Sequence, residues 1–162
     1  MNRRHVLSCL SITAVSAALG CTAQAPDAAA ETVAPLNLSD AEWKKRLGTG
    51  DAYNVLRKEA TERPYSSPLL KEKRKGTFVC AGCDLSLFTS DTKYESNTGW
   101  PSFWQAIPGH VKTKTDYKIG VPRTEYHCAR CGGHQGHIFD DGPKPTGKRY
   151  CNNGVALKFI PV

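Results

Sequence analysis

The sequence lacks a dense block of basic residues, although its 22 Lys and Arg outnumber its 15 Asp and Glu and give a net charge of +7. Its densest basic run, KEKRK at residues 71–75, is typical of a solvated loop. Nucleic-acid-binding surfaces need a larger basic stripe, so we expect no nucleic-acid partner. The sequence also lacks internal repeats apart from a doubled C-x-x-C, and it lacks an apolar run long enough to span a bilayer.

Residues 1–20 have the form of an export signal, because Arg3 and Arg4 precede an apolar stretch and then small residues. We therefore expect an exported protein of the bacterial periplasm. The run ALGC, which ends at Cys21, resembles a bacterial lipoprotein box. A lipid on Cys21 would make the product a membrane-anchored lipoprotein facing the periplasm. Ordinary cleavage is the alternative, and both Sec and twin-arginine export stay open.

Residues 21–36 (CTAQAPDAAAETVAPL) are rich in Ala, Pro and Thr and show no apolar period, which is typical of a flexible tether. The remaining residues, 37–162, have the length of one compact domain. We expect this domain to carry the function and to be a monomer.

Two short helices are predicted at the start of this domain. Ser39 and Glu42 fit a capping box ahead of a helix that reaches Leu47, and a second helix is predicted from Asp51 to about Thr61. Further along, β-branched and aromatic residues alternate with polar ones in short segments, at residues 76–80, 111–119, 123–128 and 156–160. The prediction is an α+β fold, mainly β, in which bent antiparallel sheets form a small barrel-like core with short N-terminal helices.

Four cysteines come as two C-x-x-C pairs, Cys80 with Cys83 and Cys128 with Cys131. In each pair the chain can turn so that both sulfurs face one point, and four thiolates suit a tetrahedral zinc ion. The sequence therefore predicts one structural zinc per chain. Two alternatives stay open: disulfides, which form in exported proteins, and a thioredoxin-type redox pair, although no βαβ pattern surrounds either motif.

Cys151 belongs to no pair and is flanked by Arg149 and Asn153. A nearby cation favours the thiolate, which is the nucleophilic form of cysteine. The sequence thus separates structural sulfur from reactive sulfur and points to redox chemistry. A buried, inert cysteine is the alternative.

These motifs and several others resemble the peptide methionine-R-sulfoxide reductases, the zinc-containing type of the methionine sulfoxide reductase B family. The resemblance covers residues 37–162 and rests on both C-x-x-C pairs and on RPYSSPL at 63–69, GWPSF at 99–103, HQGHIFDDGP at 134–143, GKRYCNN at 147–153 and LKF at 157–159. It implies a barrel-like β core with N-terminal helices. It also implies repair of oxidative damage, in which the R epimer of methionine sulfoxide in proteins and peptides is reduced to methionine.

The resemblance implies a catalytic set of Cys151, His134, His137 and Asn153. Cys151 is the implied nucleophile, which becomes a sulfenic acid when methionine leaves. His134 and His137 are implied to lie around the substrate oxygen as hydrogen-bond donors or proton suppliers, with His137 the closer. Asn153 is implied to position substrate, solvent or His137.

The implied substrate-binding set is Trp100, Phe139 and Arg149. The indole of Trp100, with Phe139 nearby, is implied to meet the substrate methyl group, and Arg149 is implied to favour the Cys151 thiolate. Core packing is the alternative for Trp100. An aromatic wall for the methyl opposite polar groups for the oxygen is what selection of one sulfur epimer requires.

The sequence departs from the family at Thr98, where many members carry a second cysteine that resolves the sulfenic acid. We therefore expect an external thiol, from a thioredoxin-like or glutaredoxin-like partner, to reduce Cys151, unless a retained Cys21 reaches it on its tether. Two other functions stay open: a zinc-ribbon binding module, and a general thiol–disulfide oxidoreductase that uses one C-x-x-C pair.

Overall fold

The computed structural model describes residues 33–162, which include the whole predicted domain. The predicted export signal, Cys21 and most of the predicted tether lie outside these residues, so the boundaries at residues 20 and 36 stay predictions. Within residues 33–162, no helix is both long enough and apolar enough to cross a membrane.

Two short helices open the domain, as predicted: α1 (Asp40–Leu47) and α2 (Asp51–Lys58). The predicted capping box is present at α1. The backbone N–H of Ser39 donates to the Glu42 carboxylate (2.7 Å), and the Ser39 hydroxyl accepts from the Glu42 N–H (3.4 Å). Helix α2 ends earlier than predicted, because Glu59 takes a left-handed conformation (φ 54°) that stops the helix.

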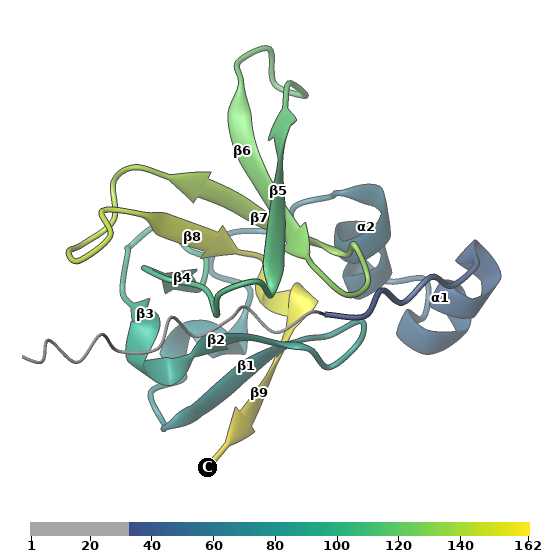
Figure 1. Ribbon diagram of the computed structural model, residues 1–162, viewed down its shortest axis with the longest axis horizontal. Helices are drawn as coiled ribbons and strands as arrows, with labels where there is room; N and C mark the ends of the chain where they lie inside the picture. The colour runs from purple at the N-terminus through teal and green to yellow at the C-terminus, as the bar shows by residue number, and fades with distance from the viewer. Residues whose placement is uncertain (1–32) are drawn as a thin grey trace, which may run out of the picture.

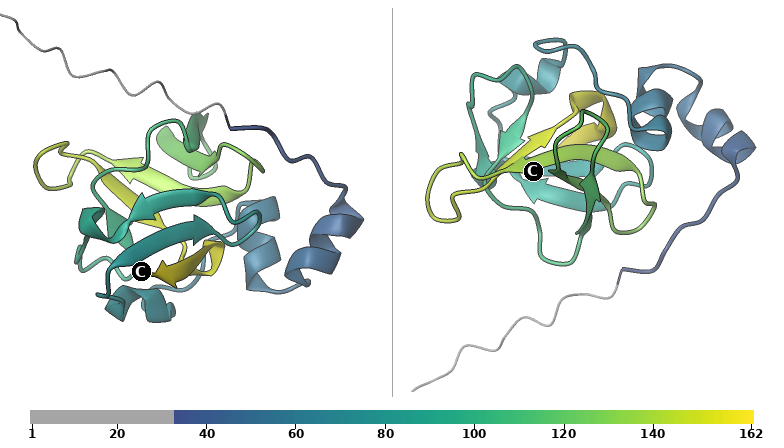
Figure 2. Two further views of the ribbon diagram at one scale, coloured as in Figure 1. Left: turned by 60° about the horizontal axis from the view of Figure 1, so that its bottom comes forward. Right: turned by 90° about the horizontal axis from the view of Figure 1, so that it is seen from above.

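The strands form two antiparallel sheets (Figures 1 and 2). The smaller sheet has the order β2-β1-β9, made of Ser86–Thr89, Gly76–Cys80 and Leu157–Pro161. The larger sheet has the order β3-β4-β8-β7-β6-β5, made of Lys93–Tyr94, Ser102–Phe103, Arg149–Asn152, His134–Phe139, Arg123–Cys128 and Val111–Asp116. Three short 3₁₀ turns complete the domain: η1 (Pro68–Lys71), η2 (Ser90–Thr92) and η3 (Gly154–Ala156). These elements confirm the α+β, mainly β prediction.

The barrel-like core of the prediction is not closed among residues 33–162, because no strand of one sheet pairs with a strand of the other. The reason lies at η3, which leads the chain out of β8 in the larger sheet and into β9 in the smaller one. The two sheets pack against each other through buried aromatic rings instead. Phe88 stacks on Phe103 with ring centroids 4.1 Å apart, and Phe78 meets Phe103 at 4.9 Å.

This packing fixes the strands around the unpaired cysteine. Tyr150, on β8 next to Cys151, meets the rings of Tyr126 at 5.3 Å and Phe88 at 5.9 Å. Helix α2 packs on β7 and η3, so the residues that follow α2 lie near the end of β8. The aromatic core therefore holds one face of β8 and leaves the other for a site.

Candidate active site

The site begins with the register of two neighbouring strands. β7 and β8 are antiparallel, and His137 lies directly opposite Cys151. Side chains opposite each other on paired strands point to the same face, with Cβ atoms about 5 Å apart. On the other side of β8, Ser102 of β4 lies opposite Cys151. The strand register, not nearness in the sequence, therefore brings the imidazole and the thiol together.

A cavity of about 130 Å³ lies over this pair. It brings together five of the seven side chains predicted for catalysis and substrate binding: Cys151, His137, Asn153, Trp100 and Phe139. Four residues that the sequence analysis did not single out complete the lining: Thr61, Arg123, Gly136 and Asn152. Gly136 permits the close approach of β7 to β8, because a Cβ built there would lie 1.9 Å from the carbonyl oxygen of Cys151.

The Cys151 thiol is half-buried, and this burial raises its pKa above the ordinary value. The charge of Arg149 and a hydrogen bond with Thr98 lower the pKa, but they do not outweigh the burial. The net result is a thiol that is protonated at neutral pH, and the predicted role of Arg149 in favouring the thiolate stays a prediction. Such a thiol needs a base before it can attack.

Arg149 does not line the cavity. Its guanidinium forms two hydrogen bonds with the Asp141 carboxylate (2.7 and 2.8 Å) and lies 4.3 Å from the ring centroid of Phe139. This arrangement fixes the Phe139 ring at the cavity wall by a cation–π contact. Arg149 lies on the same strand as Cys151, and its charge lowers the pKa of the Cys151 thiol.

His137 is held by a residue that the sequence analysis missed. Its Nε2 lies 2.8 Å from Asp116 Oδ2 at the end of β5. Asp116 also accepts from the Lys118 N–H (2.8 Å) and from Arg123 (2.6 Å). The Lys118 N–H and then His137 hold the pKa of this carboxyl well below its usual range, so it is an acceptor and Nε2 carries the proton. Burial lowers the pKa of His137 despite Asp116, which leaves a neutral imidazole whose Nδ1 can accept a proton.

His134 lies outside the cavity lining. It is buried, its Nδ1 lies 2.6 Å from Glu125 Oε1, and its ring centroid is 5.5 Å from that of His137. Burial opposes ionisation of Glu125, but hydrogen bonds from His127 (3.0 Å) and His134 lower the pKa of its carboxyl to about 2. His134 thus packs behind His137, and its predicted contact with the substrate oxygen stays a prediction.

The Asn153 side chain is already occupied on both sides. Its Oδ1 accepts from the Glu62 N–H (3.0 Å), and its Nδ2 donates to the Gln135 carbonyl (2.9 Å). Glu62 in turn accepts the Trp100 indole N–H at its carbonyl (3.2 Å), while its buried carboxylate accepts from the Gly154 N–H (2.5 Å). Asn153 therefore helps to fix the segment that holds the Trp100 ring at the cavity.

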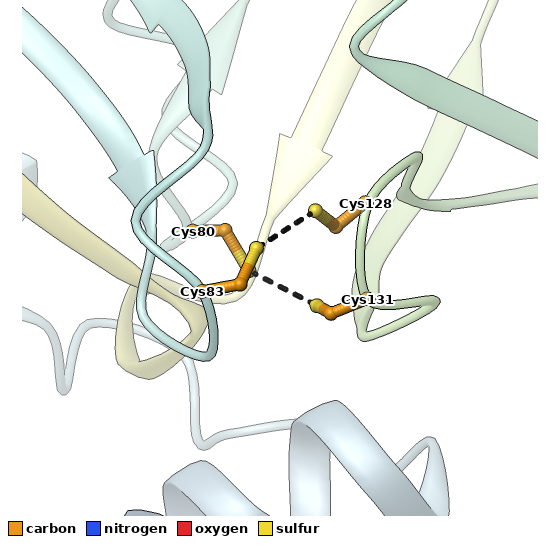
Figure 3. Close-up of side chains that lie close together, drawn as sticks. All are labelled: Cys80, Cys83, Cys128 and Cys131. Atoms are coloured by element: carbon orange, nitrogen blue, oxygen red, sulfur yellow. Dashed lines mark hydrogen bonds between the residues drawn. The ribbon is translucent and has the colours of Figure 1, made fainter. Parts of the chain in front are cut away.

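The four cysteines of the C-x-x-C pairs meet at a separate place (Figure 3). All four are buried, and their sulfurs lie within 4.8 Å of one another, with 3.7 Å between Cys80 and Cys131 and 3.4 Å between Cys83 and Cys128. A disulfide has an S–S distance of about 2.05 Å, so these are free thiols. Four sulfurs at about 2.3 Å from a tetrahedral zinc lie about 3.8 Å apart. The cluster can therefore hold a metal ion such as zinc.

Comparison with known proteins agrees with this geometry. The SelR domain family matches residues 49–161. A peptide methionine sulfoxide reductase MsrB of Leptospira interrogans is 52% identical over 125 residues, which cover 76% of this chain and 95% of the relative. One from Agrobacterium fabrum is 48% identical over 128 residues, covering 78% and 94%. Peptide methionine sulfoxide reductase B1, chloroplastic, of Arabidopsis thaliana is 51% identical over 124 residues, covering 76% and 61%.

Proposed function

This chain belongs to the SelR-domain family of peptide methionine sulfoxide reductases, and we propose that it reduces the R epimer of methionine sulfoxide in proteins and peptides, with Cys151 as the nucleophile. The observation that supports this most is the placement of Cys151 directly opposite His137, in one cavity with Trp100. A thiol, a base and an aromatic wall around one small space are the groups that sulfoxide reduction needs. Repair of oxidised methionine follows as the biological role.

The reaction moves one oxygen atom and two electrons. The Cys151 thiol passes its proton to Nδ1 of His137, and the thiolate attacks the sulfoxide sulfur. The oxygen then passes from the substrate sulfur to the Cys151 sulfur: the substrate S–O bond and the transient S–S bond break, an S–O bond to Cys151 forms, and the methionine sulfur gains the two electrons that Cys151 loses. His137 returns the proton to the oxygen, so the products are methionine and a Cys151 sulfenic acid. Asp116 keeps the imidazole turned for both transfers, because it holds Nε2.

Epimer selection follows from the two sides of the cavity. Trp100 and Phe139 offer apolar surface to the methyl group, while His137 offers the proton for the oxygen. A sulfoxide of the opposite hand, with its sulfur at Cys151, would place its oxygen against the aromatic side. An unpaired polar atom buried in this way costs about 1–3 kcal/mol, which favours one epimer by roughly 5- to 150-fold.

The proposed function predicts a preference for one epimer and a requirement for His137. With dithiothreitol as reductant, the protein should reduce R-methionine sulfoxide roughly 5- to 150-fold faster than the S epimer. His137→Asn should lower kcat for the R epimer about 100-fold, because the amide cannot relay a proton. Separate assays of the two purified epimers, with methionine quantified by chromatography, measure both effects.

The matched control for this experiment is His110→Asn, since His110 Nδ1 donates to the Ser86 carbonyl (2.6 Å) and His110 does not line the cavity. This control should retain the kcat of the parent protein. Equal rates of the parent on both epimers would contradict the cavity assignment, and an active His137→Asn variant would contradict the proton relay alone.

We propose that Cys151 is regenerated by an external thiol from a thioredoxin-like or glutaredoxin-like reductant. A first thiol attacks the sulfenic sulfur and releases water, which leaves a mixed disulfide. A second thiol attacks this disulfide, releases the Cys151 thiol and leaves as a disulfide. Within residues 33–162, every cysteine other than Cys151 belongs to the buried cluster, so no second cysteine lies beside it.

Introducing a cysteine at Thr98 should restore an internal route. The Thr98 side chain lies close enough to Cys151 to lower the pKa of its thiol, so we expect a sulfur placed there to reach the sulfenic acid. In a Cys9→Ser, Cys21→Ser background without added thiol, one equivalent of substrate should make Thr98→Cys lose two hydrogens as a disulfide. The parent background should instead give a sulfenic acid that dimedone traps. Intact mass and peptide mapping distinguish the two products.

The control is Ser96→Cys, because the Ser96 hydroxyl contacts Thr98 (2.9 Å) and Ser102 (2.7 Å). This variant should remain largely sulfenic. If the parent background itself formed a disulfide between Cys151 and a cluster cysteine, the separation of structural and reactive sulfur would be wrong.

We propose that the cysteine cluster holds one structural zinc, which would bridge the turn after β1 and the turn after β6 and supply no redox chemistry. The sulfur separations and the burial of all four thiols support this assignment. Export through residues 1–20, with or without a lipid on Cys21, remains our proposal for the N-terminus, as does a monomeric state. The mass of the mature protein separates lipidation, ordinary cleavage and retention.

A further inference from the structure

Three large apolar side chains stand exposed on the turn between β5 and β6. Tyr117, Ile119 and Val121 are 68%, 61% and 54% exposed, and within residues 33–162 they are half of the six large hydrophobic residues that are exposed. They lie within five consecutive residues of the turn, and we call these three side chains the apolar tip. Figure 1 shows the β5–β6 hairpin projecting from the body of the domain.

Both ends of this turn meet the active site. Asp116, just before the turn, holds His137, and Arg123, just after it, lines the cavity and pairs with Asp116. Residues of an extended chain advance about 3.3 Å each, so every residue of the apolar tip, being at most three residues from the nearer of Asp116 and Arg123, lies within about 10 Å of one of them. The tip therefore lies close to the active site.

The hairpin is also held by ion pairs with the end of helix α2. Glu59, at the end of α2, pairs with Lys114 on β5 and with Lys118 in the turn (2.6 Å). Individual exposed ion pairs are weak, but two ion pairs on one carboxylate together orient the β5–β6 hairpin. They also give the charge of Lys118 a partner. Tyr117, Ile119 and Val121 thus make up the apolar part of the tip, beside Lys118, whose charge is paired with Glu59.

The size of the cavity decides what reaches the tip. A volume of about 130 Å³ accommodates one side chain, so the residues on either side of an oxidised methionine must lie outside. Consecutive residues of an extended peptide are about 3.8 Å apart, and the second or third residue from the sulfoxide therefore reaches the tip. In a polypeptide substrate, peptide bonds to the oxidised methionine keep these flanking residues beside the tip.

We propose that Tyr117, Ile119 and Val121 form a docking surface for apolar residues that flank an oxidised methionine in an unfolded or extended polypeptide. This inference rests on the proposed function and adds to it a substrate class: oxidised segments whose neighbouring side chains are hydrophobic. Such segments are exposed when a protein unfolds, and burying their apolar side chains against the tip contributes to binding. The free amino acid gains nothing from this surface.

The test compares two substrates in one protein. One is N-acetyl-methionine-R-sulfoxide amide, and the other is a blocked pentapeptide with leucine on both sides of the R-sulfoxide. In full-length protein, Tyr117→Ser/Ile119→Ser/Val121→Ser should lower kcat/KM for the pentapeptide at least tenfold, mainly through KM, and change it less than twofold for the single residue. The control Ile160→Ser, at a residue that is 52% exposed on β9, should change neither value.

Each other outcome has a distinct meaning. An equal loss on both substrates would show that the turn acts through Asp116 and His137, and it would overturn the docking surface. An unchanged kcat/KM for the pentapeptide would also overturn the docking surface. So would sedimentation that finds the parent a dimer and the triple variant a monomer, since a second copy of the chain would then cover the tip. If the parent reduced neither substrate, the proposed function itself would fail.

Discussion

Replacing Cys151 with serine should lower kcat for methionine-R-sulfoxide at least about 1,000-fold, because a serine hydroxyl is a far weaker nucleophile than a thiolate. Among residues 33–162, Cys151 is also the only cysteine that lines the cavity and can accept the sulfoxide oxygen. The fold of the Cys151→Ser protein should be intact, because a hydroxyl is close in size to a thiol. Methionine release from purified R epimer, followed with excess dithiothreitol, measures the loss.

The control for this variant is its metal content. Cys151 is not among the four sulfurs of the cluster, so Cys151→Ser should bind the same amount of zinc as the parent and melt at the same temperature. Activity within tenfold of the parent would sink the assignment of Cys151 as nucleophile. A loss of zinc together with activity would mean that the two sulfur sites are not independent.

The features that the sequence predicted correctly are local or carry their own spacing. The capping box joins Ser39 to Glu42 within one helical turn, so both partners are visible in the sequence. The C-x-x-C spacing likewise places two sulfurs at one point, and the cluster confirms that the two pairs converge. The cavity gathers most of the residues that the family resemblance singled out, although their roles stay proposals.

The features that the sequence did not predict depend on contacts between distant strands. Asp116 holds His137 only because β5, β6 and β7 pair in one register, and the sequence gives no sign of that pairing. Glu62 lies in an irregular segment, yet its backbone and carboxylate connect Asn153, Trp100 and Gly154. The two-sheet arrangement depends on the η3 turn between β8 and β9. The alternation of residues in a strand does not tell whether the next strand joins the same sheet or another one.

The second large effect is expected at the metal cluster. Cys83→Ser should bind little zinc, because three thiolates and a hydroxyl hold the ion poorly. The cluster connects the turn after β1 to the turn after β6 across residues 84–127. A cross-link that closes a loop of this length contributes about 4 kcal/mol through chain entropy. At about 3 °C per kcal/mol for a domain of this size, Tm should fall by about 12 °C.

Elemental analysis and thermal unfolding followed by circular dichroism measure the two effects, and Cys151→Ser is the matched control because it removes a thiol outside the cluster. The loss of stability should extend toward the active site, because Gln135 connects the cluster to the neighbour of Cys151. Gln135 donates to Cys80 Sγ (3.4 Å) and accepts from Asn152 (3.4 Å). Should Cys83→Ser not fold, treating the parent with a chelator tests the same point, with an expected loss of zinc and a lower Tm. A parent protein that contains no zinc, or one that keeps its Tm after its zinc is removed, would contradict the structural metal site.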